Sequence, residues 1–322
     1  MADYDLFNGD ADGIFSLLQL RQVDPRPTAT RITGVKRDIK LFPRITGKVG
    51  PGDRITALDI SMAKNTDGLI EVLKDGAEVL FIDHHQTGRI PASERLTVIT
   101  DDAMEMCTAH LVNTYLDGAK AAWAVCGAFG DNFHALAQRI AKTHGLTLPL
   151  GQLRELGELV NYNAYGLTVE DLHIHPDDLF DILLAYPDPV MFLADQHPIL
   201  ETLRSGYRAD WDIAQSAREI DNSDAGQILS LPAGAASSRI AGLFGNALVE
   251  EEPELAFAVL TELDDGANFR VSIRAPRERS SGSAADIASD FGGGGRAAAA
   301  GIDALSEADL ARFIDLFRAT FA

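Results

Sequence analysis

The chain has 322 residues and carries 48 acidic against 28 basic side chains, giving a formal net charge of −20. This length predicts about two domains, and the hydrophobic content of 46% is enough for a sizeable core. The negative charge argues against a protein that grips long nucleic acid through broad basic surfaces, so any nucleic-acid substrate should be short or held locally.

The first twenty residues lack the basic start and long apolar run of a signal peptide, and no apolar stretch is long enough to cross a bilayer. The two cysteines, Cys107 and Cys126, are too few for a disulfide framework and are expected to be small buried packing residues. We therefore expect a cytoplasmic protein without membrane contact.

The chain begins with a short strand, Tyr4 to Asn8, followed by Gly9-Asp10-Ala11-Asp12-Gly13 and a helix from Ile14 to Arg21. Asp10 and Asp12 lie two residues apart on the turn, so both can point to one place above the edge of a sheet. Their ordinary alternative is a role as turn and helix-capping residues, which is common for aspartate.

Further polar residues follow apolar segments. Thr30 to Val35 is predicted to be the second strand, and Arg54 to Leu58 a third that ends at Asp59. The apolar segment from Ala77 to Ile82 is predicted to be a buried parallel strand, and it ends at Asp83-His84-His85. The segment from Ala119 to Ala128, helical or strand-like, leads into Asp131. One basic segment is expected to be an ordinary solvated face; it contains Lys36, Arg37, Lys40, Arg44, Lys48 and Arg54.

Because ligands of open α/β sheets bind at the carboxyl ends of the strands, these acids and histidines should gather along one rim. Burying so many like charges together is costly unless cations compensate them. Carboxylates with some imidazole suit Mn²⁺ or Mg²⁺, and two such ions a few ångströms apart promote displacement at phosphorus. The pattern indicates hydrolysis of a phosphoester or a phosphoanhydride.

The remainder predicts mostly helices up to residue 200, a connector over 201–226, and a second domain over 227–322. In that domain Glu254 to Glu262 and Asn268 to Arg274 flank a hairpin turn. A glycine run, Gly292 to Gly295, precedes Arg296 and can cradle a phosphate with its backbone N–H groups, although such a run also suits a flexible linker. Ala297 to Ala300 is compatible with the start of a helix.

Taken together, these motifs resemble the DHH phosphoesterase superfamily, in particular members that carry a C-terminal DHHA1 domain. Asp10-Ala11-Asp12-Gly13 resembles the first motif, Asp59 the second, Asp83-His84-His85 the third and Gly130-Asp131 the fourth. Val271 to Arg274 and Gly292 to Gly301 resemble the DHHA1 signature. The resemblance implies an α/β fold: a parallel-sheet DHH domain over 1–200 with helices on both faces, and a smaller α/β DHHA1 domain with a mixed sheet.

The resemblance also implies two Mn²⁺ ions, with Mg²⁺ as the alternative. Asp59 would bridge both ions, His85 would contact the scissile phosphate, and Asp83 would orient the histidines. The implied metal ligands are Asp10, Asp12, Asp59, His84 and Asp131, and the implied substrate-binding residues are Ser272, Arg274, Gly293, Gly294, Gly295 and Arg296.

Three positions depart from the family pattern. Leu6 stands where many members have a histidine, Asn8 where RecJ-like exonucleases have an aspartate, and Arg296 where the glycine run usually ends in histidine. The site of Asp10 is therefore expected to lack one ligand. Arg296 is expected to bind phosphate and not to move protons near neutral pH.

The sequence thus favours a manganese phosphodiesterase, or phosphohydrolase, that cleaves short single-stranded oligonucleotides or small nucleotides. Two alternatives stay open: hydrolysis of pyrophosphate or polyphosphate, and a degenerate accessory protein that binds metal or nucleic acid without catalysis. The oligomeric state is not fixed by the sequence, and a homodimer is compatible with it.

Overall fold

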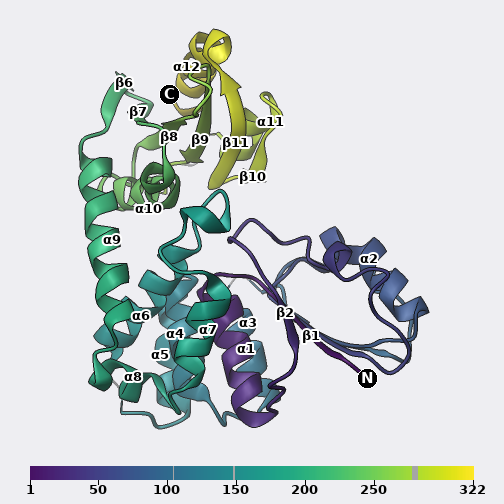
Figure 1. Cartoon of the computed structure of the whole chain (residues 1–322). Helices are drawn as coiled ribbons and strands as arrows, with labels where there is room; N and C mark the ends of the chain where they lie inside the picture. The colour runs from purple at the N-terminus through teal and green to yellow at the C-terminus, as the bar shows by residue number, and fades with distance from the viewer. Residues whose placement is uncertain (104, 148, 278–281) are drawn as a thin grey trace. The chain divides into compact units, whose positions relative to one another are not determined.

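The computed structural model describes residues 1–103, 105–147, 149–277 and 282–322. The chain divides into two compact units, Met1–Arg204 and Ser205–Ala322 (Figure 1). The sequence-based division at residues 200 and 227 stays a prediction.

The first unit contains a five-stranded sheet in the order β2-β1-β3-β4-β5, in which every neighbouring pair is parallel. The strands are β1 (Asp3–Phe7), β2 (Thr30–Ile32), β3 (Arg54–Leu58), β4 (Glu78–Asp83) and β5 (Leu96–Thr100). The α-helices of this unit are α1 (Ala11–Val23), α2 (Met62–Lys74), α3 (Thr108–Tyr115), α4 (Ala121–Gly130), α5 (His134–Thr143), α6 (Leu150–Asn163), α7 (Pro176–Leu184) and α8 (Pro189–Asp195), with short 3-10 turns η1 (Phe42–Arg44) and η2 (Val169–Asp171).

Helices cover both faces of this sheet, and most residues of its central strands β3 and β4 are accordingly buried. Leu6, Ala57 and Phe81 point to one face and form a core cluster with Leu69 of α2 and Phe42 of η1. On the other face α1 contacts β1 and β3, and α3 contacts β4 (Figure 1). The expected α/β architecture of this part is confirmed.

The sequence leaves the apolar segment before Asp131 open between a helix and a strand. This segment forms α4, and Asp131 is its C-cap. Ala121 to Gly130 is buried on nearly every side, and a helix that is apolar all round cannot be distinguished from a buried strand by periodicity.

Helix α9 (Pro198–Gln215) spans the boundary between the units. The second unit contains a six-stranded mixed sheet in the order β10-β11-β9-β8-β7-β6, in which only β7 and β8 pair in parallel. Its strands are β6 (Arg218–Ser223), β7 (Gly226–Leu231), β8 (Ala256–Glu262), β9 (Asn268–Arg274), β10 (Gly294–Arg296) and β11 (Ala299–Ser306). The other elements are α10 (Ala235–Glu251), α11 (Ala284–Ser289), η3 (Glu307–Asp309) and α12 (Leu310–Phe321).

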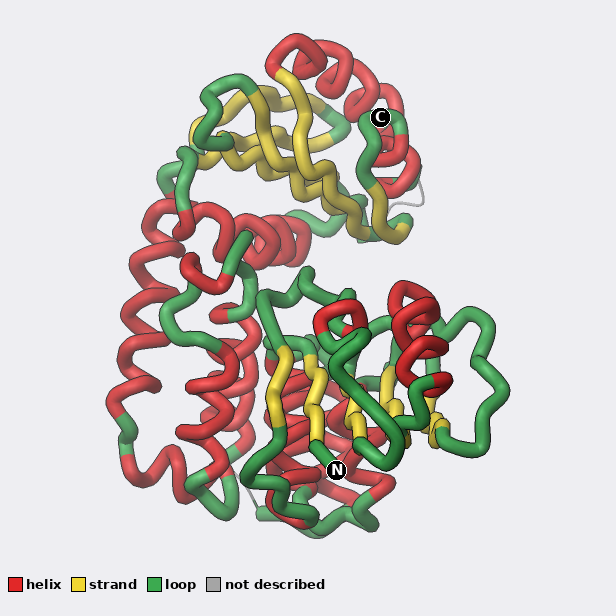
Figure 2. The backbone as a smooth tube through the Cα atoms, turned by 45° about the vertical axis from the view of Figure 1, so that its right-hand side comes forward, coloured by secondary structure: helices red, strands yellow, loops and turns green. Residues whose placement is uncertain are grey.

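Helices flank this second sheet as well (Figure 2). Phe313, Phe317 and Phe321 of α12 are fully buried in one core with α11 and with apolar residues of β7 to β9, whereas α10 packs on β8 and β9. The predicted hairpin of β8 and β9 is confirmed. Ala297 to Ala300 begins no helix; β11 starts at Ala299 and pairs with β9 and β10.

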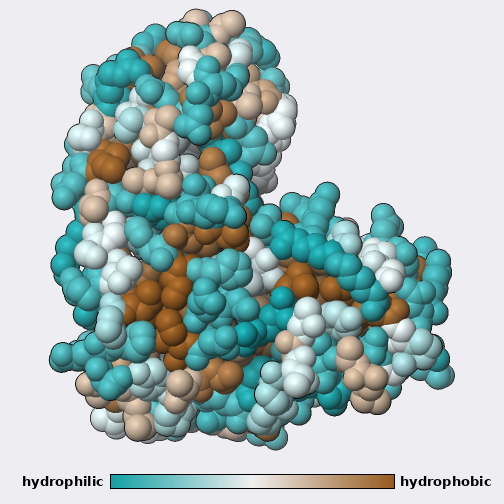
Figure 3. Space-filling model, viewed as in Figure 1, coloured by the Kyte–Doolittle hydropathy of each residue, from teal (hydrophilic) through white to brown (hydrophobic). Residues whose placement is uncertain are grey.

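The face shown in Figure 3 is mostly hydrophilic, with apolar side chains gathered beside α7. In the part of the chain that the structure describes, we find no helix with the length and apolar character needed to cross a bilayer.

Candidate metal centre

Three neighbouring strands deliver acids and histidines to the same edge of the first sheet. Asp10 follows β1 as the N-cap of α1, and its carboxylate accepts a hydrogen bond of 3.1 Å from the backbone N–H of Gly13. A Cβ at residue 13 would lie 2.1 Å from the carbonyl oxygen of Asn8, so this tight turn requires glycine. Asp59 follows β3 and Asp83 ends β4. The predicted convergence at the carboxyl ends of these strands is what the parallel register produces.

Asp59 has a backbone φ of 56°, in the left-handed region that residues other than glycine rarely adopt. Aspartate and asparagine tolerate this conformation better than most side chains. The turn directs the Asp59 carboxylate inward, where it is 2% exposed and accepts a hydrogen bond of 3.1 Å from the hydroxyl of Thr108.

The imidazole of His84 stands at the centre of the cluster. Its Nε2 lies 3.5 Å from Asp59 Oδ1, 3.7 Å from Asp131 Oδ2 and 3.9 Å from Asp12 Oδ2. These separations are shorter than about 4.2 Å, twice the length of a metal–ligand bond of about 2.1 Å, so each carboxylate could share one ion with His84. Four side chains from four elements thus face one point, and they include the buried Asp12 and the more accessible Asp131.

Asp12 is fixed by the start of α3. Its Oδ2 and Oδ1 accept hydrogen bonds of 2.7 Å each from the backbone N–H groups of Thr108 and Ala109. The positive end of the helix dipole favours a carboxylate at this place. The backbone of Thr108 and Ala109, far along the sequence from Asp12, therefore orients this possible metal ligand.

His85 belongs to a second group of possible ligands, together with Asp59 and His84. Its Nδ1 lies 2.7 Å from Asp83 Oδ1 and 3.9 Å from Asp59 Oδ1. Asp83 is fully buried, and its Oδ2 has no hydrogen-bond partner within the described residues. Asp83 Oδ1 is thus within hydrogen-bond distance of His85 Nδ1, and the role of Asp83 in orienting the histidines stays a prediction.

The cluster carries an excess of negative charge. Burial, and then the neighbouring Asp10 and Asp12 carboxylates, hold the pKa of Asp59 well above its usual value. Burial also raises the pKa of Asp12 to about 6, against the opposing attraction of His84. Asp10 behaves differently: burial would raise its pKa, but the ammonium of Lys36 outweighs this, so the pKa is lowered.

These residues fit a divalent cation. The donors are carboxylate oxygens and imidazole nitrogens, which Mn²⁺ and Mg²⁺ accept, and no thiolate belongs to either group of described residues. The structure supplies the groups Asp59, His84, His85 and Asp12, His84, Asp131; Asp10 belongs to neither of these groups. The raised carboxyl pKa values and the unpartnered Asp83 oxygen are the cost of this arrangement without a cation.

Sequence reasoning missed three residues of this centre. Lys36 was expected on a solvated face, yet its Nζ reaches Asp10 and Asp131. Thr108 and Asn161 also contact the cluster, through Asp59 and Lys36 respectively. Nothing in the spacing of these three residues sets them apart, because each is brought in by a loop or helix whose packing is nonlocal.

In the second unit, the predicted substrate-binding residues have unequal environments. The Arg274 guanidinium donates hydrogen bonds to Asn246 Oδ1, Ser272 Oγ and the carbonyl oxygens of Gly242 and Ile273, at 2.5 to 3.0 Å. Arg296 is exposed on β10, and none of the described residues forms an ion pair or hydrogen bond with its side chain. Of the two arginines predicted to bind substrate, Arg296 is thus the one whose side chain is available to a ligand.

The glycine run lies in the hairpin of β10 and β11. A Cβ on Gly293 would be 2.2 Å from the carbonyl oxygen of Gly301, and one on Gly295 would be 2.5 Å from that of Ala299. A Cβ on Gly294 would meet no atom within 4 Å. Close backbone packing therefore accounts for Gly293 and Gly295, whereas Gly294 is not required by its neighbours.

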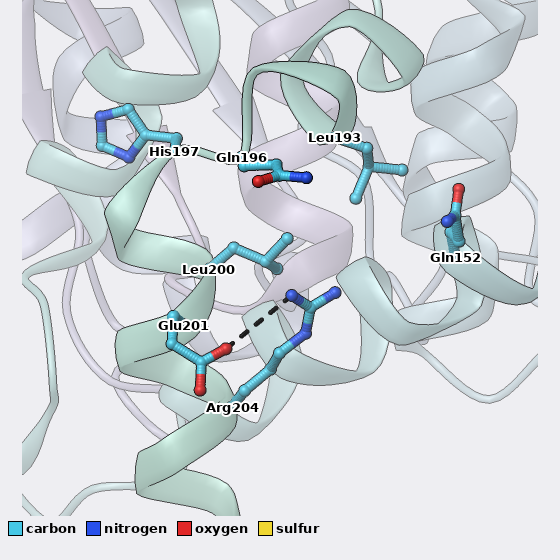
Figure 4. A pocket seen from close by; sticks show the side chains of 7 residues that line it. All are labelled: Gln152, Leu193, Gln196, His197, Leu200, Glu201 and Arg204. Atoms are coloured by element: carbon cyan, nitrogen blue, oxygen red, sulfur yellow. Dashed lines mark ion pairs between the residues drawn. The ribbon is translucent and has the colours of Figure 1, made fainter.

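A separate cavity of about 450 Å³ lies among α6, α8 and α9 in the first unit (Figure 4). It is lined by Gln152, Leu193, Gln196, His197, Leu200, Glu201 and Arg204. Arg204 lies 4.0 Å from Glu201 and pairs closely with Glu155. None of the residues predicted to be functional lines this cavity, so it is not the site that the motifs define.

No protein-family model matches the sequence, and no curated protein matches it. Solved structures do match over almost the whole chain. A manganese-bound structure of the exonuclease RecJ matches with a TM-score of 0.63 and 16% identity, covering 99% of this chain and 89% of its own. The DHH domain of a protein named as a member of a ribosomal-protein family matches with a TM-score of 0.63 and 11% identity, covering 98% and 85%.

A pGpG-specific phosphodiesterase from Vibrio cholerae matches with a TM-score of 0.55 and 15% identity, covering 100% of this chain and 99% of its own. At these identities the matches show the fold and nothing further. The chain has the fold of the DHH superfamily, as its motifs predict.

Proposed function

We propose that this protein is a metal-dependent phosphodiesterase that cleaves short oligonucleotides or small nucleotides, with Mn²⁺ as its ion. The observation that carries the proposal is the position of His84 Nε2 at 3.5 to 3.9 Å from three carboxylates of three different elements. A cluster of this kind opposes folding unless a cation is bound, so its presence indicates a use beyond stability.

A divalent ion held there would polarise a phosphoryl oxygen and make water acidic enough to react near neutral pH. The residues of the chain have separate tasks. The start of α3 holds the Asp12 carboxylate in place as a ligand. The turn at Asp59 and the Thr108 hydroxyl hold the Asp59 carboxylate. His85 is one-third exposed and is held by Asp83, so it can donate a hydrogen bond to the phosphate being cleaved.

We assign substrate binding to the second unit, through Arg296 and the backbone of the glycine hairpin. Arginine binds phosphate in a bidentate manner, and exposed backbone N–H groups favour anions. Arg274, with Ser272, supports this proposal in another way, since its bonds to α10 hold β9, the strand on which β11 of the hairpin pairs.

A short substrate is supported by the net charge of −20, which repels extended polyanions. The names of two structural neighbours are compatible with this choice, since one is an exonuclease and another a pGpG-specific phosphodiesterase.

The test compares a dinucleotide, pAp, pyrophosphate and a long single strand as substrates, with Mn²⁺, with Mg²⁺ and with a chelator. We expect fastest release of mononucleotides from the dinucleotide or pAp with Mn²⁺, and none with the chelator. Faster hydrolysis of pyrophosphate would instead select a phosphoanhydride hydrolase. Inactivity on every substrate would contradict the enzyme proposal and favour an accessory protein.

Asp59→Asn is the decisive variant because asparagine accepts a φ of 56° and keeps the shape of the side chain. We expect activity to fall by about 10² to 10³-fold, the usual loss when one electrostatic partner of a reacting group is removed. The apparent melting temperature of the metal-free protein should not fall, because a buried like charge is removed. Asp67→Asn, on the exposed surface of α2, is the matched control and should leave activity unchanged.

A further inference from the structure

Lys36 places a protein cation inside the acidic cluster. Its Nζ lies 2.5 Å from Asp10 Oδ2, 3.1 Å from Asn161 Oδ1 and 3.3 Å from Asp131 Oδ1. The three oxygens come from the start of α1, the end of α6 and the end of α4. An ammonium group has three N–H donors, so these contacts occupy all of them.

The surrounding structure fixes this side chain. The backbone N–H of Lys36 donates a hydrogen bond of 2.9 Å to the carbonyl oxygen of Ala164, and Nζ lies 5.6 Å from the centre of the Tyr165 ring. Arg37 and Lys40, its basic neighbours in the sequence, are exposed, whereas the Lys36 side chain is only 28% exposed. Lys36 is therefore directed into the cluster by its local backbone and is not part of the solvated basic face.

We propose that the ammonium of Lys36 occupies the place of one of two cations in this cluster, so that the protein binds a single divalent ion. This inference rests on the proposed metal-dependent function for its context. The chain thereby supplies from its own side chain the positive charge that a second metal ion would bring.

The two carboxylate oxygens of Asp131 face different cation positions. Its Oδ1 accepts from Lys36, and its Oδ2 lies 3.7 Å from His84 Nε2. Asp10 Oδ2 contacts Lys36 Nζ, and Asp10 belongs to neither of the ligand groups described above. The oxygens left for a metal ion are those of Asp12, Asp59 and the second oxygen of Asp131, all near one nitrogen of His84.

The leucine at the first motif is consistent with this division. Leu6 is fully buried in the apolar core, so it offers nothing to a cation beside Asp10. A lysine is a point charge of fixed valence and cannot activate water as a metal ion does. Lys36 therefore stabilises negative charge beside the position at His84 without taking part in water activation.

The experiment measures bound Mn²⁺ per chain by equilibrium dialysis with elemental analysis, together with the electron paramagnetic resonance spectrum of the bound ion. For the wild-type chain we expect about one ion per chain and the spectrum of an isolated Mn²⁺. Two tightly bound ions with a spin-coupled spectrum, or no bound ion, would overturn the proposal.

Lys36→Met keeps the length of the side chain and removes its charge. We expect about two ions per chain and spin coupling in this variant at raised Mn²⁺, since Asp10 and Asp131 lose their cation. Binding that stays at one ion would show that Lys36 does not exclude the second.

Asp10→Asn and Asp12→Asn form a matched pair that does not depend on the folding of the lysine variant. Asp10→Asn should retain about one ion, whereas Asp12→Asn should lose it or bind it at least about tenfold more weakly. Loss of the ion in Asp10→Asn, with its fold intact by circular dichroism, would overturn the proposal. Because these readouts do not use hydrolysis, an inactive protein that binds one ion would contradict the proposed function and leave this inference standing.

Discussion

The acidic cluster of the first unit and the glycine hairpin of the second both stand out in the sequence, but the structure explains them differently. Gly293 and Gly295 are accounted for by the contact of β10 with β11, since any side chain there would collide with backbone. No packing requirement of this kind explains the acidic cluster. Asp59 and Asp12 are buried with other acids, and their pKa values are raised as a result.

This difference separates two kinds of motif. Residues that the fold requires are expected in any protein with that fold, whatever it does. Residues that oppose the fold persist because something else compensates them, and here a cation is the compensation with the matching charge. The acidic cluster is therefore stronger evidence for function than the glycine run, although both are equally visible in the sequence.

The largest expected effect is the dependence of manganese binding on pH. Asp12, with its pKa raised to about 6, must lose its proton to act as a ligand. The affinity for Mn²⁺ should therefore fall by about tenfold per pH unit for each proton released as the pH drops below about 6. Titration of the protein with Mn²⁺ at pH values from about 5 to about 8, on either side of the raised Asp12 pKa, measures this effect.

The effect on stability has the opposite sign in the absence of metal. The folded-state pKa of Asp12 is above its ordinary value of 3.8, so its contribution favours the folded protein in acid and is lost as the pH rises through about 6. Added Mn²⁺ should consequently raise the melting temperature more at neutral than at acidic pH. Added Mn²⁺ should slow hydrogen exchange in the first unit and not in the glycine hairpin. Equal slowing in both would contradict the distinction between a cation-binding cluster and a hairpin explained by packing.

The sequence predicts the sheet edge well because strand ends are local features. Asp59 and Asp83 each follow a clear apolar strand, and parallel pairing then brings them together. Asp131 does lie beside His84, but a helix and not a strand delivers it. Lys36 could not be predicted, because its role depends on the contact of its loop with the end of α6, where Asn161 lies 125 residues later in the chain.

Substitution of two arginines of the second unit should have effects of intermediate size on stability, and these effects test which residues the fold requires. Arg274→Ala should lower the free energy of unfolding by about 2 to 3 kcal/mol, because it strands hydrogen-bond acceptors on α10 and β9. Arg296→Ala should change stability by less than about 0.5 kcal/mol, as for most exposed positions. Denaturant titration of the two variants measures both values.

For activity, measured per folded molecule, Arg296→Ala should have a larger effect than Arg274→Ala, which is the reverse of their order for stability. Arg296→Ala should raise KM about tenfold with kcat nearly unchanged, since it removes a charged hydrogen bond that binds substrate before and during reaction. A large loss of kcat at constant KM would contradict a binding role for Arg296.

The smallest expected effect comes from adding a single methyl group to the hairpin. A Cβ at Gly294 meets no atom within 4 Å, so Gly294→Ala should change stability by less than about 1 kcal/mol. Gly293→Ala collides with the Gly301 carbonyl and should destabilise the second unit by about 1 to 3 kcal/mol. If the hairpin backbone approaches a phosphate, Gly294→Ala should also raise KM by a few fold while the fold is kept. An unchanged KM would mean that the glycine run serves only the packing of β10 on β11, and that Arg296 binds substrate without help from the backbone.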